Sequence, residues 1–259
     1  MSDYLHNKIF TIGDTQPEHV NMPANYDMLL LPRPDAMLYE NAGFTLSYKG
    51  MIADFGTGTY AEFLLAPEPL SVCQLNMRAH TRQQYNVLLG FSFAVEGRYM
   101  SFWTTTLNHQ FFPVGYGPEV FPSMESLEFI GGNDALGNPR NYFHALNWGQ
   151  AKYWSTTKRL ILIFYDGFKK CFWTRPESVA LTEDFRILRV NCAHNIPQIE
   201  YGDIDLITEC SYMRMNKDEI SFDFTTSAIV EARTELIEDV ANYYDPWTEM
   251  PIIYPEDDS

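Results

Sequence analysis

The chain lacks the short motifs by which several enzyme classes are recognised. It has no G-x-S-x-G element, no P-loop and no G-x-G-x-x-G fingerprint after a predicted strand. It has only four cysteines and six histidines, and neither set has the spacing of a metal site. These absences remove the usual starting points for a hydrolase triad, a phosphate loop and a zinc centre. We therefore expect no cofactor and no metal.

Basic residues are also scarce. Eighteen Lys and Arg stand against 34 Asp and Glu, which gives a net charge of −16. Such a field repels phosphate backbones and anionic lipid surfaces, so we expect no nucleic-acid partner and no membrane partner. No apolar run reaches the roughly 18 residues of a membrane span, and the first residues do not resemble a signal peptide. With free thiols, these features favour a cytoplasmic location.

Aromatic residues are abundant, with 18 Phe, 16 Tyr and 5 Trp in 259 residues. Together with a hydrophobic fraction of 46%, they exclude general disorder. Aromatic side chains favour strands, and they also line ligand cavities. Two interpretations follow, a β core filled by aromatics and an aromatic-lined pocket.

The pattern along the chain predicts a mainly β (α+β) protein, a single-domain antiparallel β-barrel or cone with a C-terminal helix and long loops. Residues 1–43, rich in Pro, Asn and Asp, predict an extended N-terminal arm, and residues 44–259 predict the domain. Asp166-Gly167 between apolar runs predicts a hairpin. The other candidate strands are 44–54, 59–66, 70–79, 84–95, 98–106, 186–192, 198–213 and 218–226.

Two further segments depart from the strand pattern. Residues 113–156 are rich in Gly and Pro, which is typical of loops that serve as lids or binding segments. Between residues 227 and 244, apolar residues such as Ala232, Leu236 and Val240 recur at helical spacing, and Pro246 follows. This periodicity predicts an amphipathic helix near the C-terminus.

Two carboxylates are the main candidates for acid/base chemistry. Glu62 lies on a predicted strand between Tyr60 and Leu64, after a Gly-rich turn at 56–58. If that face points inward, burial would raise the pKa of the carboxyl group and suit a catalytic role; the alternative is a solvent-facing strand residue. Glu119 follows Gly-Pro in a turn, and its alternative is an ordinary solvated carboxylate.

A histidine and several large side chains complete the candidate site. His109 follows a predicted aromatic strand and is a candidate general base, the alternative being a hydrogen-bonded packing residue. The candidates for contact with a small-molecule substrate are Tyr60, Tyr99, Trp103, Phe121 and Met124.

Taken in order, several segments resemble the acetoacetate decarboxylase-like family. They are Gly56-Thr-Gly-Thr-Tyr60-Ala-Glu62, Gly97-Arg-Tyr99, Pro118-Glu119-Val-Phe121-Pro122 and Phe185-Arg-Ile-Leu-Arg-Val followed by Ile196-Pro and Ile204-Asp-Leu. The resemblance implies a cone-shaped β-barrel and places Glu62 at the active-site glutamate of the family.

The chain departs from that family where its chemistry is concentrated. Family decarboxylases form a Schiff base through a lysine, whereas Ser123-Met124 follows Pro122 here. Tyr39-Glu40-Asn41 stands where the family has a substrate-binding arginine. Imine-based decarboxylation is therefore not available by the usual route.

Three functional hypotheses follow. The first is a cofactor-independent enzyme, of lyase, isomerase or cyclase type, that acts on a small apolar carbonyl-containing metabolite. The second is a structural protein of a larger particle, including a homo-oligomer, because the two ends of the chain resemble segments that pack on neighbours. The third is a non-catalytic carrier of a hydrophobic ligand.

Overall fold

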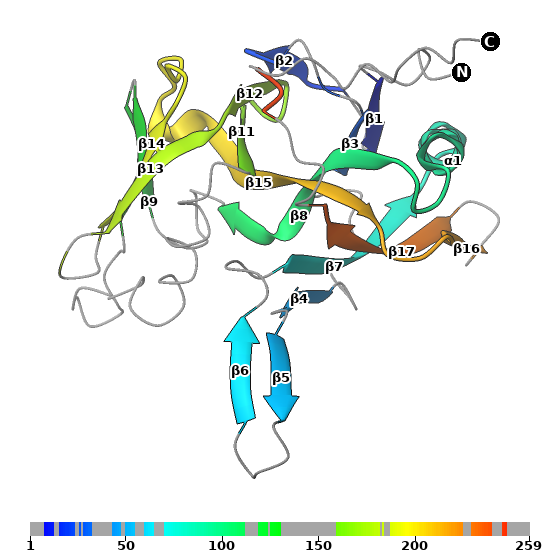
Figure 1. Cartoon of the computed structure of the whole chain (residues 1–259). Coiled ribbons are helices and arrows are strands. Elements are labelled where there is room, and N and C mark those ends of the chain that lie inside the picture. The colour runs from blue at the N-terminus through cyan, green and yellow to red at the C-terminus, as the bar shows by residue number, and fades with distance from the viewer. Residues whose placement is uncertain are drawn as a thin grey trace, which may run out of the picture.

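A computed structural model gives the arrangement of the chain (Figure 1). The residues it describes are 8–12, 16–23, 26, 28–32, 43–47, 50–54, 60–64, 70–111, 119–123, 125–130, 159–181, 183, 187–224, 229–239 and 245–247. Within these ranges the protein is mostly β, with one α-helix.

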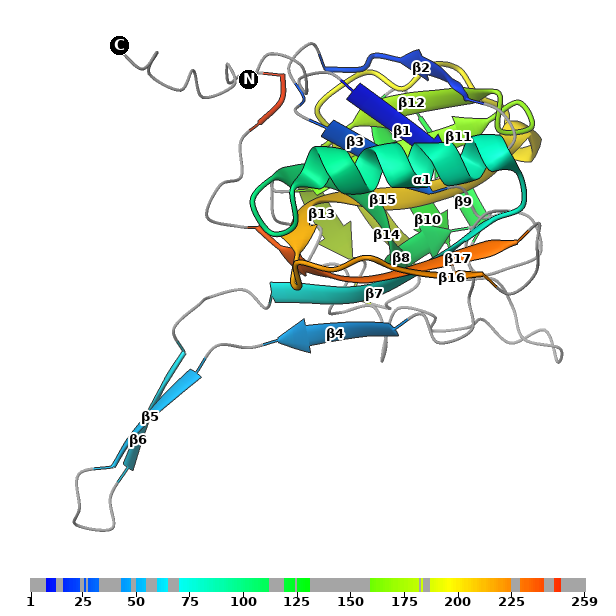
Figure 2. The same ribbon diagram turned by 90° about the vertical axis from the view of Figure 1, so that its right-hand side faces the viewer.

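The largest element is an eleven-stranded sheet that curls into a half-barrel (Figures 1 and 2). Along its main path the strands are β1 (Lys8–Ile12), β3 (Met28–Pro32), β8 (Ser101–Phe111), β15 (Ile204–Met215), β11 (Arg159–Tyr165), β12 (Lys170–Thr174) and β2 (Glu18–Val20). The branch from β15 holds β17 (Val230–Glu238), which pairs with β16 (Ser221–Phe224) and β7 (Leu70–Ala79), and β4 (Gly43–Ser47) pairs with β7. The long strand β15 therefore joins both parts of the sheet.

Two smaller sheets accompany the large one. The first contains β13 (Pro176–Leu181), β14 (Ile187–Cys192), β10 (Ser126–Ile130) and β9 (Glu119–Pro122) in that order. The second consists of β5 (Gly50–Asp54) and β6 (Tyr60–Leu64), which form an antiparallel pair. Both views show this pair projecting away from the rest of the molecule (Figures 1 and 2).

The predicted strand at 84–95 is wrong, because α1 (Arg82–Val95) is a helix. Thr81 caps it in a capping box with Gln84, whose backbone N–H donates to the Thr81 hydroxyl at 3.2 Å. Leu88 and Phe91, at helical spacing from Gln84, are buried against the sheet. The continuous apolar composition suggested a strand, but the capping pair and this spacing specify a helix.

The predicted C-terminal helix is also wrong over its described part, since residues 230–238 form strand β17. Val230, Ala232 and Leu236 are buried at a two-residue period, whereas only Ala232 and Leu236, four residues apart, also fit a helical one. Strand β17 pairs with β7 along Val230–Ile237 and also with β15 and β16. These pairings with distant segments decide the conformation.

The described part of the N-terminal segment contributes strands to the large sheet. Strands β1, β2 and β3 belong to the large sheet, and residues 28–31 are wholly buried. The pairs β1–β3, β3–β8 and β2–β12 are parallel, so the sheet is mixed where an antiparallel one was expected. The Gly/Pro-rich segment 113–156 likewise includes two strands, β9 and β10.

The hairpin predicted at Asp166-Gly167 is confirmed. Strands β11 and β12 pair antiparallel on either side of it. Asp166, Gly167 and Phe168 all adopt positive φ, at 57°, 64° and 60°. Asp and Gly accept this conformation more readily than most residues, which explains why the turn forms there.

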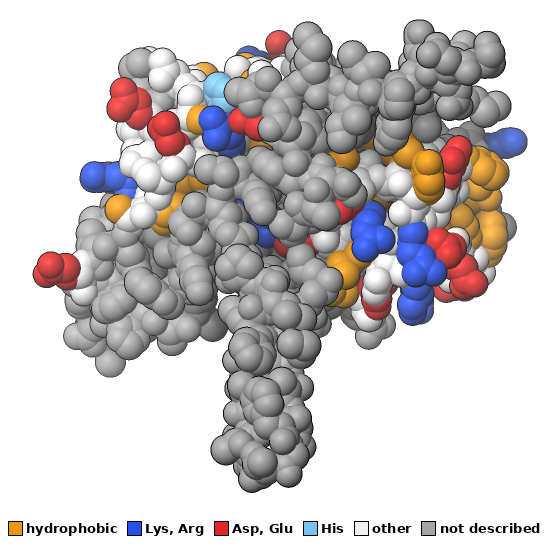
Figure 3. Space-filling view, in the orientation of Figure 1, with side chains coloured by type: hydrophobic (Ala, Val, Ile, Leu, Met, Phe, Trp, Pro, Cys, Tyr) orange, Lys and Arg blue, Asp and Glu red, His pale blue; other side chains and the backbone are white. Residues whose placement is uncertain are grey.

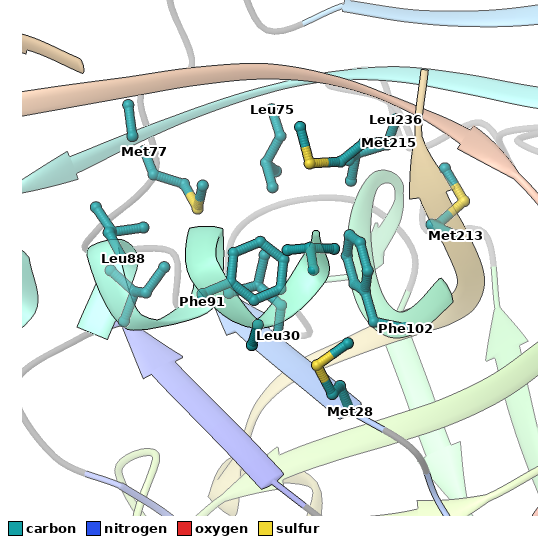
Figure 4. Packing of buried hydrophobic residues seen from close by; sticks show 14 of the residues in the cluster. Met28, Leu30, Leu75, Met77, Leu88, Phe91, Phe102, Met213, Met215 and Leu236 are labelled. Carbon is teal, nitrogen blue, oxygen red and sulfur yellow. The ribbon is translucent and has the colours of Figure 1, made fainter. Parts of the chain in front are cut away.

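Three apolar clusters surround the curled sheet. The first packs α1 against the sheet, and in it Phe91 meets Phe102 edge to face at 4.9 Å between ring centroids (Figure 4). The second joins Ile161, Ile163 and Ile207 to the four-stranded sheet. The third contains Trp103, among residues of β3, β11, β12 and β15.

Candidate functional site

The three predicted catalytic residues lie on three different sheets. Glu62 is in β6 of the hairpin, Glu119 begins β9 of the four-stranded sheet, and His109 is in β8 of the large sheet. Their backbone positions are described, whereas their side chains lie outside the described part of the structure.

The predicted substrate contacts are dispersed as well. Trp103 is completely buried in the third apolar cluster, with its ring 5.1 Å from that of Tyr212. Tyr99 is 80% exposed, in the turn after α1. Tyr60 and Phe121 lie on β6 and β9, and Met124 lies outside the described residues. Trp103 and Tyr99 therefore do not line a common pocket.

A buried charged cluster, which sequence analysis missed, lies in the middle of the large sheet. Arg159 forms an ion pair through Nε with Glu209 at 3.0 Å and another through Nη1 with Glu238. The hydroxyl of Ser211 donates to Glu209 at 2.6 Å. All four side chains are nearly or fully buried. One guanidinium thus holds carboxylates from two strands, β15 and β17.

The position of this cluster follows from strand alternation. Along β15, Ile207, Glu209, Ser211 and Met213 fall on one face, so the polar pair lies between residues of two apolar clusters. Opposite Glu209 the pairing with β8 is irregular, because Thr208 pairs with Gln110 while Cys210 pairs with Thr105. Extra residues of β8 are accommodated there, as in a β-bulge.

That irregular stretch of β8 includes His109. His109 is thus one of four residues, 106–109, that fall in the register shift between Thr208 and Cys210 of β15. Near this cluster, the hydroxyl of Ser101 donates to a third buried carboxylate, Asp239, at 2.5 Å. A charged residue within or beside an uninterrupted apolar run, as at Arg159 before Leu-Ile-Leu-Ile, was the signal that could have located the cluster.

The projecting hairpin is a second notable feature. Register pairs Met51 with Phe63 and Ala53 with Ala61 on one face, while Ile52, Tyr60 and Leu64 fall on the other, so both faces carry apolar residues. Neither β5 nor β6 pairs with any other strand in the described chain. A two-stranded hairpin is marginally stable in water unless another element covers it.

An apolar strip on the outer side of α1 is the third feature. Tyr85, Leu89 and Phe93 recur every four residues, and Phe93 is 73% exposed. Phe224 of β16 extends the strip, with its ring 5.9 Å from Tyr85. Figure 3 shows hydrophobic side chains gathered at this edge of the molecule, over α1 and β16. We call Tyr85, Leu89, Phe93 and Phe224 the α1 ridge.

A polar groove of about 320 Å³ lies on the outer face of β7, β16 and β17. Lys217, Arg233 and Glu235 are among its lining residues. Arg233 donates to Glu231 at 3.2 Å, and Asn216 donates to Glu235. These contacts already engage Arg233 and Glu235, so the groove has the character of a solvated sheet face.

Two histidines have perturbed pKa values. Burial lowers the pKa of His19 to about 4, and its Nδ1 accepts a hydrogen bond from Trp173 Nε1 at 3.0 Å. Burial, with the positive charge of Arg175, lowers the pKa of His194. No three His, Cys, Asp or Glu side chains in the described ranges gather as a metal site would require.

No protein-family model and no curated protein matches this chain. Among the described residues, no helix is long and apolar enough to cross a membrane.

Proposed function

We propose that this chain is a structural protein that self-associates into a larger assembly. The observation that carries the proposal is the projecting hairpin of β5 and β6, which pairs with no other described strand. By register, Met51, Ala53, Ala61 and Phe63 share one face of the hairpin, and Ile52, Tyr60 and Leu64 share the other. Since a two-stranded hairpin is only marginally stable by itself, packing against other copies in an assembly would stabilise it.

The exposed aromatic residues support the same proposal. Phe93, Tyr99 and Phe224 are each at least 67% exposed. Single exposed apolar residues are ordinary, but Phe93 and Phe224 belong to the α1 ridge, and grouped apolar residues are typical of a contact surface. Aromatic residues are also enriched at the centres of protein interfaces.

The test is the dependence of mass on concentration. Sedimentation velocity of the full chain is expected to show species larger than a monomer, with a fraction that grows with protein concentration. A variant with residues 50–64 replaced by a short Gly/Ser linker is expected to stay monomeric with an unchanged far-ultraviolet spectrum from the body. A monomer at every concentration in the unmodified chain would overturn the proposal.

A cofactor-independent enzyme is a second candidate, supported by the buried Arg159 cluster. Glu209 lies across from the irregular stretch of β8 that holds His109, and bulges of this kind are over-represented beside active sites. An acceptor carboxylate and a histidine would suit acid/base chemistry on a small carbonyl-containing metabolite. In this proposal the family resemblance supplies the fold, and no Schiff-base lysine takes part.

This candidate is tested by turnover. The chain would be incubated with a panel of small keto acids and enolisable carbonyl compounds, and proton exchange or product would be followed by NMR. His109→Ala is expected to abolish any turnover while thermal unfolding stays near that of the parent chain. Turnover that survives this substitution, or no turnover of any compound, would contradict the candidate.

A further inference from the structure

We propose that residues 16–23, which carry strand β2, form a strap that opens from the body as a local unit when His19 takes up a proton. We call this segment the β2 strap. Its release would free one edge of β12 while the rest of the large sheet stays folded. The inference concerns a single copy and does not depend on self-association.

The β2 strap links the two ends of the curled sheet. In sequence β2 lies between β1 and β3, which are neighbours at one end of the sheet, whereas β2 itself pairs with β12 at the other end. Both views show β2 lying along β12 at the top of the molecule (Figures 1 and 2). Ile9 of β1, Met22 of the strap and Trp173 of β12 all pack in the third apolar cluster. Opening of the strap would therefore uncover part of that cluster.

The strap is attached to the body through a short edge pairing. Strand β2 has three residues in register with β12 and pairs with no other described strand. The Glu18 N–H donates to the Lys169 carbonyl oxygen at 2.7 Å, and the Asn21 side-chain amide donates to the Trp173 carbonyl oxygen at 2.8 Å. Edge elements with few contacts open at a lower free energy than the centre of a sheet.

His19 and Trp173 form the titratable part of this attachment. The indole N–H of Trp173 donates to Nδ1 of His19 at 3.0 Å, and the ring centroids are 5.7 Å apart. Since Nδ1 accepts, the proton of the neutral imidazole is on Nε2. Trp173 is 1% exposed, so its N–H depends on this acceptor. A second proton on Nδ1 would set two donors against each other, and the hydrogen bond would be lost.

The surroundings of His19 favour the neutral imidazole while the strap is closed. Burial lowers its pKa to about 4, and Nε2 is buried without a hydrogen-bond partner among the described residues. Cys171, its register partner in β12, is a buried thiol whose pKa is raised by burial, so it carries no charge near neutral pH. One position earlier on each strand, Glu18 and Lys170 are register partners of opposite charge. The open strap, with the imidazole in water, therefore binds a proton more tightly, and acid favours opening.

The first experiment measures opening by amide hydrogen exchange of the full chain in dilute solution. Amides of β2 are expected to exchange through an opening that depends little on urea, whereas amides of β15 exchange only through urea-dependent global unfolding. With an ordinary histidine pKa in the open strap, the opening constant is expected to rise about twentyfold from about pH 7 to about pH 5, after correction for intrinsic exchange rates. Equal protection and equal urea dependence for β2 and β15 would overturn the inference.

His19→Gln tests whether the imidazole is the titrating group. Glutamine keeps an acceptor for Trp173 but takes up no proton, so the opening constant is expected to become nearly independent of pH over this range. His80→Gln is the matched control, because it makes the same change at an exposed histidine outside the strap and is expected to keep the rise of the parent chain. A rise that persists in His19→Gln would contradict the role of His19.

A cross-link tests whether opening separates β2 from β12. Glu18→Cys combined with Lys170→Cys places two thiols on register partners, and the four native cysteines are all buried. Adjacent strands lie about 4.8 Å apart, which is within the range that a disulfide spans. The oxidised double variant is expected to lose the pH-dependent exchange of the strap, and reduction is expected to restore it. The same exchange in the oxidised and reduced forms would overturn opening at this pair of strands.

Discussion

The buried side chain of Arg159 forms ion pairs with carboxylates from two other strands. Arg159 lies in β11 and is 3% exposed. It pairs with Glu209 of β15 and with Glu238 of β17, so one guanidinium links three strands. Charges taken out of water are tolerated only when each is paired. A different arrangement of these strands would leave a buried charge unpaired, so the cluster disfavours it. An apolar set of the same volume could give the same free energy of unfolding but would not discriminate between strand arrangements in this way.

Arg159→Met is expected to lower the free energy of unfolding by about 3–5 kcal/mol, because two carboxylates lose their buried partner. Urea denaturation followed by tryptophan fluorescence measures this loss. Arg98→Met is the control, since its partner Asp218 is well exposed and its removal is expected to change stability little. The triple substitution Arg159→Met, Glu209→Leu, Glu238→Leu is expected to recover part of the loss; no recovery would argue against the electrostatic cause.

His19 gives stability a dependence on pH. Its folded-state pKa of about 4 lies below the ordinary 6.5, so the unfolded chain takes up a proton first as the pH falls. Stability is therefore full above about 6.5 and decreases through the window down to about 4. His19→Gln, which keeps an acceptor for Trp173, is expected to flatten this part of the profile. An unchanged slope in thermal melts between these pH values would refute the assignment to His19.

At the scale of the element, α1 depends on one buried face. Phe91 has no exposed surface and packs on Phe102, whereas Phe93, two residues later, faces solvent. Phe91→Ala is expected to cost about 3–5 kcal/mol through lost burial and a residual cavity. Phe93→Ala, the same change on the same helix, is expected to stay within about 0.5 kcal/mol in the dilute monomer. Similar losses for both would mean that α1 packs by a different face.

The two wrong elements show what sequence could and could not predict. Around α1 the local evidence was sufficient, because Thr81 and Gln84 form a capping box and buried residues follow at helical spacing. In β17 it was not, since Ala232 and Leu236 fit both periods and the strand is decided by pairing with β7 and β15. The hairpin at Asp166-Gly167 was predictable because turn chemistry is local.

The candidate sites likewise depend on contacts between distant segments, which local sequence patterns do not reveal. The buried cluster joins residues from β11, β15 and β17, and no local pattern links them. The strand around Glu62 was predicted, but its projection away from the sheet depends on how the rest of the chain packs. Exposure of Phe93 and Tyr99 likewise depends on the whole molecule.

At the scale of the whole molecule, charge opposes association. Copies that each carry −16 repel one another, and dissolved salt screens that repulsion over about 10 Å at 0.1 M. Because the proposed contact is mainly apolar, raising the salt concentration from about 0.05 to about 0.5 M is expected to strengthen self-association. Sedimentation equilibrium at the two ionic strengths measures the change. Weaker association in salt would indicate a contact held by ion pairs.

The central place of β17 also governs when the molecule can fold during synthesis. Its partner β7 lies about 160 positions earlier in the chain. The pairing runs from Val230 opposite Ala79 to Ile237 opposite Val72. The cluster beneath α1 needs Val230, Ala232 and Leu236 from this late strand. Pairing of such separated segments closes large loops and is slow. While the ribosome is still adding these residues, α1 and β7 have no completed core to join, so a nascent chain passes most of its synthesis with this apolar surface open to chaperones.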